Sequence, residues 1–160
     1  MGVKGRHMKV YQLVRTQFLP LTLENAWNFF SSPANLSIIT PPALGLRMLD
    51  ASQTQRMYAG QIIRYRIRIL PGINVSWVTE ITHVREPYFF VDEQRSGPYA
   101  FWHHQHRFKE VPGGVEMSDE IHYAVPFGLL GNVVHRLFVG GKLKTIFDYR
   151  RVVLEKRFCK

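Results

Sequence analysis

Six strand-like segments in succession, joined by short turns, restrict this chain to an antiparallel sheet. Residues that alternate in polarity occupy the ranges 45–50, 61–70, 73–83, 88–95, 100–110 and 115–125. Pro71-Gly72, Gly97-Pro98 and Pro112-Gly113-Gly114 supply the turn residues between several of them. Because short connections join successive strands, an antiparallel meander is the simplest topology.

Helical patterns lie on both sides of this run of strands. A further strand over residues 9–18 is followed by a predicted helix over 23–30, which Thr22 can cap, and by a second short helix over 34–39. From Leu129 onward the apolar residues recur at helical spacing, which predicts a long terminal helix. Its expected buried stripe comprises Leu130, Val133, Val134, Leu137, Phe138, Leu143, Ile146 and Phe147. Gly140-Gly141 within it predicts a kink or a close approach to the sheet.

These elements predict a single α+β domain. A curved seven-stranded antiparallel sheet, wrapped around the long C-terminal helix and closed at one end by the two short helices, accommodates all of them. The chain has 160 residues and is 46% hydrophobic, enough for one sizeable core. We expect residues 8–160 to form the domain and residues 1–7, which lack periodicity, to be a tag or disordered.

Charge and cysteine content limit the function classes. The formal net charge is +9, from 21 basic and 12 acidic side chains, which raises the question of nucleic-acid binding. Arg64, Arg66 and Arg68, however, alternate with apolar residues and are expected on the solvated face of one strand. The basic residues that close the last helix are also expected in solvent, and these are Arg150, Arg151, Lys156, Arg157 and Lys160. We therefore expect no specific nucleic acid as a partner, and at most a weak attraction to anionic surfaces.

The cellular compartment follows from simple patterns. Cys159 is the only cysteine and cannot form an internal disulfide. No apolar run reaches the roughly 18 residues that cross a bilayer, and no signal-peptide pattern opens the chain. These features predict a cytoplasmic protein without a transmembrane segment.

The segment 97–108 carries the most distinctive chemistry. Side chains alternate along a strand, so Trp102, His104, His106 and Phe108 share one face. A buried imidazole needs a partner or water, so two imidazoles among aromatic rings suit the wall of a ligand cavity. Two satisfied structural histidines remain the alternative interpretation.

Strand register brings carboxylates to these histidines. If the last hairpin turns at Pro112-Gly113, His106 lies opposite Asp119, and a similar alignment about Gly97 places Asp92 near His104. The site then consists of a polar island within an aromatic wall, facing an apolar wall from two further strands. The predicted ligand-binding residues are Tyr65, Trp77, Phe90, Asp92, Trp102, His104, His106, Asp119 and Tyr123.

Two interpretations of the polar island stay open. A carboxylate beside an imidazole favours its protonated form and prepares it for proton transfer, which makes His104, His106 and Asp119 candidate catalytic residues. The same pairs also satisfy buried polar groups without any reaction, and we favour that interpretation. We predict neither a metal nor a cofactor, because His103 points away from the other two histidines and divalent sites want three or four converging ligands.

Several motifs resemble the helix-grip, or SRPBCC, superfamily, which includes START lipid-transfer domains, aromatase/cyclases and the birch pollen allergen group. They are Phe90-Val91-Asp92-Glu93-Gln94, Gly97-Pro98, Trp102-His103-His104-Gln105-His106-Arg107-Phe108, Asp119, Tyr123, Pro126-Phe127-Gly128 and Leu130-Gly131. The resemblance covers residues 8–158 and is closest to bacterial ligand-binding SRPBCC proteins labelled cyclase/dehydrase-like or cell-division-inhibitor-like.

The resemblance implies a helix-grip fold whose internal cavity binds a small hydrophobic, aromatic or lipid-like ligand. One alternative is a polyketide cyclase/dehydrase-like enzyme that uses a cavity histidine as acid or base. A second alternative is a regulatory interaction module that is reached through the basic surface. Fold alone does not decide among these, because one fold hosts many functions.

Overall fold

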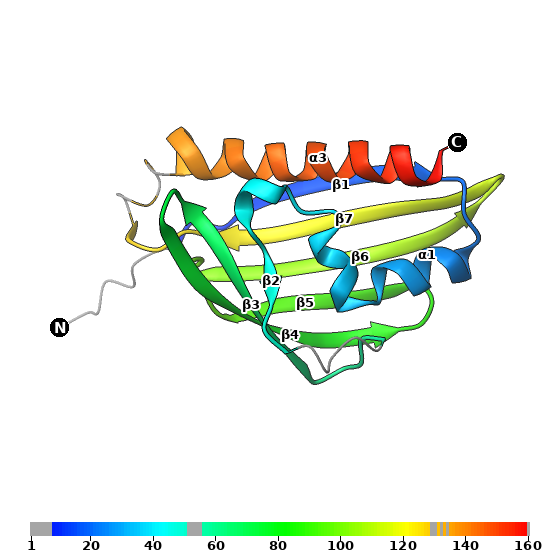
Figure 1. The fold of residues 1–160 in the computed structure, drawn as a ribbon, viewed down its shortest axis with the longest axis horizontal. Helices are drawn as coiled ribbons and strands as arrows, with labels where there is room; N and C mark the ends of the chain where they lie inside the picture. Colours follow the sequence, from blue (N-terminus) through cyan, green and yellow to red (C-terminus); the bar gives the residue numbers. More distant parts are fainter. Residues whose placement is uncertain (1–7, 51–55, 129–130, 132, 134, 160) are drawn as a thin grey trace.

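The computed structural model describes residues 8–50, 56–128, 131, 133 and 135–159, and shows a curved sheet beside a long C-terminal helix (Figure 1). Seven antiparallel strands form one sheet in the order β1-β7-β6-β5-β4-β3-β2. The strands are β1 Tyr11–Leu19, β2 Arg47–Met48, β3 Gln61–Leu70, β4 Ile73–Arg85, β5 Phe89–Ser96, β6 Phe101–Val111 and β7 Gly114–Ala124. The helices are α1 Leu23–Phe30, the 3₁₀-helices η1 Pro33–Ser37 and η2 Pro42–Leu44, the π-helix η3 His135–Val139 and α3 Gly140–Phe158.

The predicted fold class is confirmed, and most predicted strands lie within two residues of the observed ones. One local expectation was wrong in detail. The segment expected as a strand over 45–50 forms a strand only at Arg47 and Met48, with one further backbone hydrogen bond from Leu49 to the Arg64 carbonyl of β3. The strand is short because Gly45 adopts a left-handed conformation and Asp50 binds Arg64 through its side chain. The second short helix is present as a 3₁₀-helix that begins at a proline.

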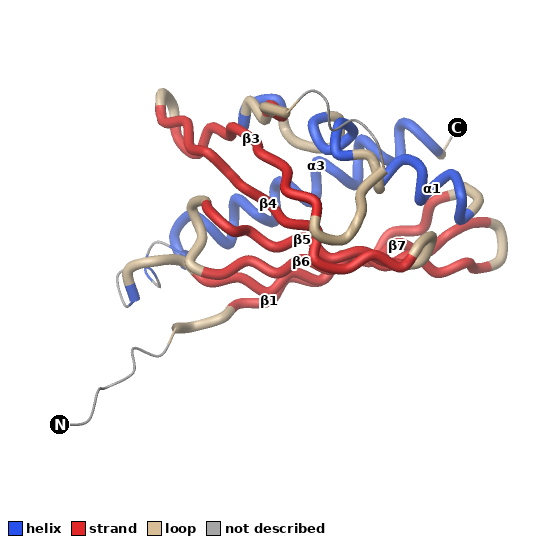
Figure 2. The backbone as a smooth tube through the Cα atoms, turned by 90° about the horizontal axis from the view of Figure 1, so that it is seen from below, coloured by secondary structure: helices blue, strands red, loops and turns tan. Residues whose placement is uncertain are grey.

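The short helix α1 closes one end of the sheet. Thr22 caps it as predicted, since its Oγ1 accepts a hydrogen bond from the Asn25 amide at 3.2 Å. The helix buries Trp27, whose ring meets Phe90 and Phe108 edge-on at 6.0 Å each. Figure 2 shows the β3–β4 hairpin rising away from the layer formed by the other long strands, which gives the sheet its curvature.

The buried stripe of the terminal helix differs from the predicted one. Leu143 and Phe147 are buried as expected, but Val133, Leu137 and Phe138 are 53%, 66% and 67% exposed. Helical spacing counted back from Leu143 reaches Val139 and His135, not Leu137 and Phe138. Leu137 and Phe138, which belong to the π-helix, therefore lie on a different side of the helical segment from Leu143 and Phe147 of α3. Leu130 and Val134 lie outside the described residues.

The apolar core is divided into three clusters. One lies beneath α1 and includes Trp27 and Phe108, one lies beneath the first half of α3 and includes Trp102 and Tyr123, and one lies on β3 and β4. Between them, on the inner face of β5, β6 and β7, the chain buries ionisable residues. The centre of the sheet therefore holds ionisable side chains between the apolar clusters.

Candidate functional site

His104 and His106 lie between the same two carboxylates. His104 Nε2 makes a 3.0 Å hydrogen bond with Asp119, and His106 Nε2 makes a 2.9 Å hydrogen bond with Asp92. The other ring nitrogens also face carboxylates, with His104 Nδ1 3.3 Å from Asp92 and His106 Nδ1 2.8 Å from Asp119. The last contact is an ion-pair approach without hydrogen-bond geometry. The two imidazole rings are 3.8 Å apart between centroids.

Strand register produces this arrangement, as the sequence predicted. His106 pairs with Asp119 and His104 with Ile121 across β6 and β7, while Asp92 pairs with His104 across β5 and β6. The four ionisable side chains, Asp92, His104, His106 and Asp119, all point inward, because residues two apart on a strand share a face. The predicted polar island is therefore present in the structure, and its residues come from three neighbouring strands.

Arg150 completes this network, and the prediction that it lies in solvent was wrong. Its guanidinium lies 3.4 Å from Asp119 and 4.5 Å from the centroid of the Phe147 ring, and the residue is buried. A signal for this position existed, because Arg150 follows Leu143 by seven residues and precedes Leu154 by four on the buried stripe of α3. We call Asp92, His104, His106, Asp119 and Arg150 the charge network.

Opposing charges within the charge network hold its groups ionised despite burial. Burial alone would lower the pKa of His104, but the carboxylates of Asp92 and Asp119 outweigh it and raise that pKa. Burial would raise the pKa of Asp119, but Arg150 and the two histidines hold it well below its usual range. The pKa of Asp92 is lowered in the same way, by both histidines against burial.

Aromatic rings line one side of the charge network. Trp102 Nε1 donates a hydrogen bond to Asp92 at 3.2 Å. The Trp102 ring contacts Trp77 edge-on at 5.1 Å and lies 6.3 Å from Tyr123. Tyr99, which the sequence analysis did not select, lies 4.8 Å from the Trp102 ring. Tyr99 follows the turn at Gly97-Pro98, and its position next to the predicted strand was the signal that could have identified it.

The remaining predicted residues lie around this centre. Phe90 stacks on His106 at 4.1 Å between ring centroids. Tyr65 is buried in the β3–β4 cluster, where burial and then the charge of Asp92 raise its pKa. The structure thus brings the predicted residues of β5, β6 and β7 together, and places Tyr65 at a neighbouring position. Whether any of them binds a ligand stays a prediction.

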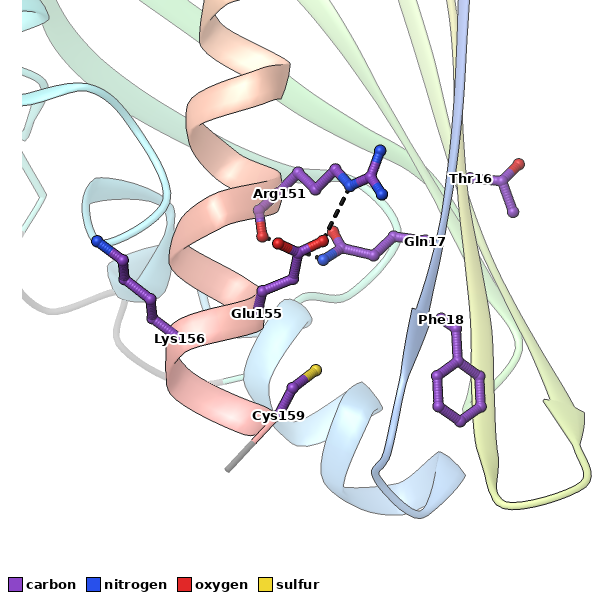
Figure 3. Close-up of a pocket in the computed structure, with 7 residues that line it drawn as sticks. All are labelled: Thr16, Gln17, Phe18, Arg151, Glu155, Lys156 and Cys159. Atoms are coloured by element: carbon purple, nitrogen blue, oxygen red, sulfur yellow. Dashed lines mark hydrogen bonds and ion pairs between the residues drawn. The ribbon is translucent and has the colours of Figure 1, made fainter.

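Two hollows lie between β1 and α3, and the larger is shown in Figure 3. It is an open groove of about 630 Å³, crossed by the hydrogen bond from Gln17 to the Arg151 carbonyl and by the Arg151–Glu155 ion pair. The smaller hollow, of about 50 Å³, reaches Asp119 and Arg150 from the same side. Its volume suits a few water molecules rather than an organic ligand.

Asp92, His104 and His106 could offer three ligand atoms to a metal, since these atoms lie within 4.8 Å of one another. The His104 and His106 nitrogens that contact Asp92 would have to lose their protons to bind a cation. Arg150 already supplies one positive charge beside Asp119. The geometry therefore favours hydrogen-bonded protons over a metal ion between these side chains.

Solved structures identify the class of fold. A protein from Chromobacterium violaceum matches with a TM-score of 0.69 at 9% identity, covering 92% of this chain and 97% of its own. Ara h 8.0201 matches with a TM-score of 0.59 at 11% identity over 92% of this chain and 99% of its own. BexL, a di-domain ARO/CYC from the BE-7585A biosynthetic pathway, matches with a TM-score of 0.61 at 14% identity over 91% of this chain and 50% of its own. The chain has a helix-grip fold.

The other comparisons found no similar protein. No protein-family profile matches the chain, and no curated protein matches its sequence. Among the described residues, no helix is both long enough and apolar enough to cross a membrane.

Proposed function

We propose that the protein binds a small, largely apolar or aromatic ligand between the inner face of the β3–β4 hairpin and α3. The observation that carries this proposal is incomplete burial of that face. Ile67, Ile69, Val75 and Trp77 continue the inward-facing rows that begin with buried residues such as Ile63, yet each is only half-buried. An apolar face that the chain itself leaves half-covered suits an apolar guest.

The charge network supports binding over catalysis. All four imidazole nitrogens lie within 3.3 Å of a carboxylate oxygen, so Asp92 and Asp119 face both rings from two sides, although His106 Nδ1 makes no hydrogen bond. Both rings are buried. Such a network fixes the shape of the inner face and presents Asp92 and the Trp102 indole at its edge, where a polar group of the ligand could hydrogen-bond.

Titration with Nile red, a neutral apolar dye, tests this proposal. Saturable binding is expected, and Trp77→Arg should weaken it because a guanidinium would enter the apolar face. Tyr88→Arg is the matched control, since Tyr88 is exposed at the β4–β5 turn. Unchanged affinity in a folded Trp77→Arg variant would remove the proposed site. Native mass spectrometry of freshly purified protein then identifies a co-purifying ligand.

A cyclase-type reaction is the second candidate, because the raised pKa of His104 keeps an acid buried beside an aromatic wall. The fold likeness to BexL fits this candidate. In that case His104→Gln should reduce turnover about a hundredfold or more while affinity stays nearly constant. In a carrier, no product forms with the wild type, and the same variant changes only affinity.

A further inference from the structure

Exposed apolar side chains gather at one end of the molecule. Phe127 is 80% exposed, and Leu137 and Phe138 of the π-helix are 66% and 67% exposed. Leu70 and Ile73, on either side of the β3–β4 turn, are 57% and 48% exposed. Figures 1 and 2 both place the β3–β4 turn and the start of α3 at the same end. We call these five residues the apolar tip. Single exposed apolar residues are ordinary, whereas a group at one end marks an interaction surface.

Specific contacts hold the apolar tip in place. Lys142, in the first turn of α3, donates a hydrogen bond to the Ile69 carbonyl of the β3–β4 hairpin. His135 of the π-helix makes a 2.8 Å hydrogen bond with the Tyr123 hydroxyl, and its ring stacks on Tyr11 at 3.5 Å. The parts of the apolar tip are therefore anchored to three strands of the sheet.

The backbone conformation of Phe127 is a second reason to regard its exposure as functional. It has φ 74°, a left-handed conformation that bulky side chains rarely adopt. The chain thus holds a large aromatic ring in solvent at a strained backbone position. Backbone strain of this kind clusters at functional sites.

The charges around the apolar tip have one sign. From Ile121 to Phe147 the sequence contains no Asp or Glu, but it contains Arg136, Lys142 and Lys144. Residues 61–79 also lack acidic side chains and carry the three arginines of β3, of which Arg64 pairs with Asp50. We call Arg136, Lys142, Lys144 and the β3 arginines the basic collar. Basic residues around exposed aromatic and aliphatic groups complement a bilayer interface with anionic headgroups.

We propose that this end of the molecule docks on a membrane surface that contains anionic lipids, with the apolar tip entering the headgroup region. A second copy of the chain fits less well, because two basic collars would face each other and repel. Docking here also places the half-covered face of the β3–β4 hairpin next to the lipid. The proposal does not depend on the ligand-binding function, since it concerns the outer surface alone.

Co-sedimentation with vesicles tests the proposal. Vesicles of phosphatidylcholine with phosphatidylglycerol are expected to bind the wild type, and vesicles of phosphatidylcholine alone are expected to bind it much more weakly. The double variant Leu137→Ser with Phe138→Ser should lose about tenfold or more in binding, because two interfacial apolar groups are removed. Phe18→Ser, which changes a 49% exposed residue at the far end of β1, is the matched control and should bind as the wild type does.

Charge reversal supplies a second, independent arm. Arg136→Glu should weaken binding to anionic vesicles about tenfold, whereas Lys156→Glu near the other end of α3 should change it much less. High salt should weaken binding of the wild type.

Equal binding of the apolar-tip variant and the wild type overturns the proposal, as does binding that ignores anionic lipid. A change in oligomeric state of the Leu137/Phe138 variant, with vesicle binding unchanged, assigns the surface to a second copy instead and equally overturns it. Vesicle binding without Nile red binding would reject the proposed ligand function and leave this proposal intact.

Discussion

At the scale of single residues, the unusual feature is the charge network, in which two imidazoles and two carboxylates contact one another inside the protein. Each carboxylate of the charge network contacts both histidines, and Asp119 also faces Arg150. Removing any one member leaves a buried charge without its partner, which costs more than the pair contributes. The network therefore acts as a unit, and its response to substitution follows from charge balance.

Asp119→Asn should lower the pKa of His104. The carboxylate of Asp119 lies 3.0 Å from His104 Nε2 and helps to raise that pKa against the effect of burial, so a neutral amide removes part of the increase. The His104 ring signals in a nuclear magnetic resonance titration measure the change. Glu120→Gln, on the outer face of β7, is the control and should leave the pKa of His104 unchanged. Identical His104 titrations in Asp119→Asn and the wild type would contradict this account.

Stability should fall on both sides of a mildly acidic optimum. The pKa of His104 in the folded protein is raised above its usual 6.5. Its contribution to stability is therefore complete below about pH 6.5 and is lost as pH rises through the folded-state pKa. The pKa values of Asp92 and Asp119 are lowered below 3.8, so their contribution is complete above about pH 4 and is lost as pH falls through the folded values.

Urea unfolding across this pH range measures the effect. His104→Gln should flatten the decline on the alkaline side and should leave the acid side steep, because both carboxylates remain. His83→Gln is the control, since His83 is exposed on β4. If the free energy of unfolding still declines on the alkaline side in His104→Gln, a group other than His104 causes that decline.

The residues of the charge network show what the sequence could and could not predict. Alternation along β6 and the position of the last turn were enough to pair His106 with Asp119, since register follows from turn geometry. Arg150 was missed because a cation near the end of a helix is usually solvated, and its buried partner lies 31 residues away in the sequence. Long-range charge pairing has no local signature.

At the scale of elements, the helical segment before the C-terminus departs most from its pattern. Apolar spacing predicted the helix itself correctly but assigned Leu137 and Phe138 to the buried face. The pattern could not show a change of helix type, which shifts the buried side by part of a turn. Strand boundaries were more predictable, because Gly and Pro turns mark them directly.

Gly140 and Gly141 form a matched pair that tests this junction. A Cβ at Gly141 would meet open space, so Gly141→Ala should raise the free energy of unfolding by about 0.5–1 kcal/mol through reduced chain entropy. A Cβ at Gly140 would lie 3.2 Å from the His135 ring, which must then shift by a few tenths of an ångström against its contacts with Tyr11 and Tyr123.

Gly140→Ala should therefore show no gain, or a loss, in urea unfolding, together with shifted His135 resonances. If both alanine variants were stabilised equally, the His135 ring would move at no energetic cost, and its contacts would not anchor the π-helix.

At the scale of the whole molecule, the three apolar clusters predict unequal local stability. The cluster beneath α1 is built from buried rings, and β6 and β7 are each paired on both sides. The outer part of the β3–β4 hairpin, by contrast, carries half-buried residues and exposed Leu70 and Ile73. Segments with less buried apolar surface open at lower free energy. The proposed ligand face thus belongs to the less stable part of the sheet.

Amide hydrogen exchange should reveal this distribution and its change on binding. Without ligand, residues 67–75 should exchange faster than the centres of β6 and β7. Nile red should slow exchange selectively in residues 67–75 and in the first half of α3, because a ligand stabilises only those conformations that bind it. With dye at about one hundred times its Kd, openings that destroy the site should become about a hundredfold rarer. In Trp77→Arg this slowing should be largely lost, while exchange in β6 and β7 should stay close to that of the wild type. Slowing that is uniform over the sheet, or confined to α1 and its cluster, would place the dye elsewhere.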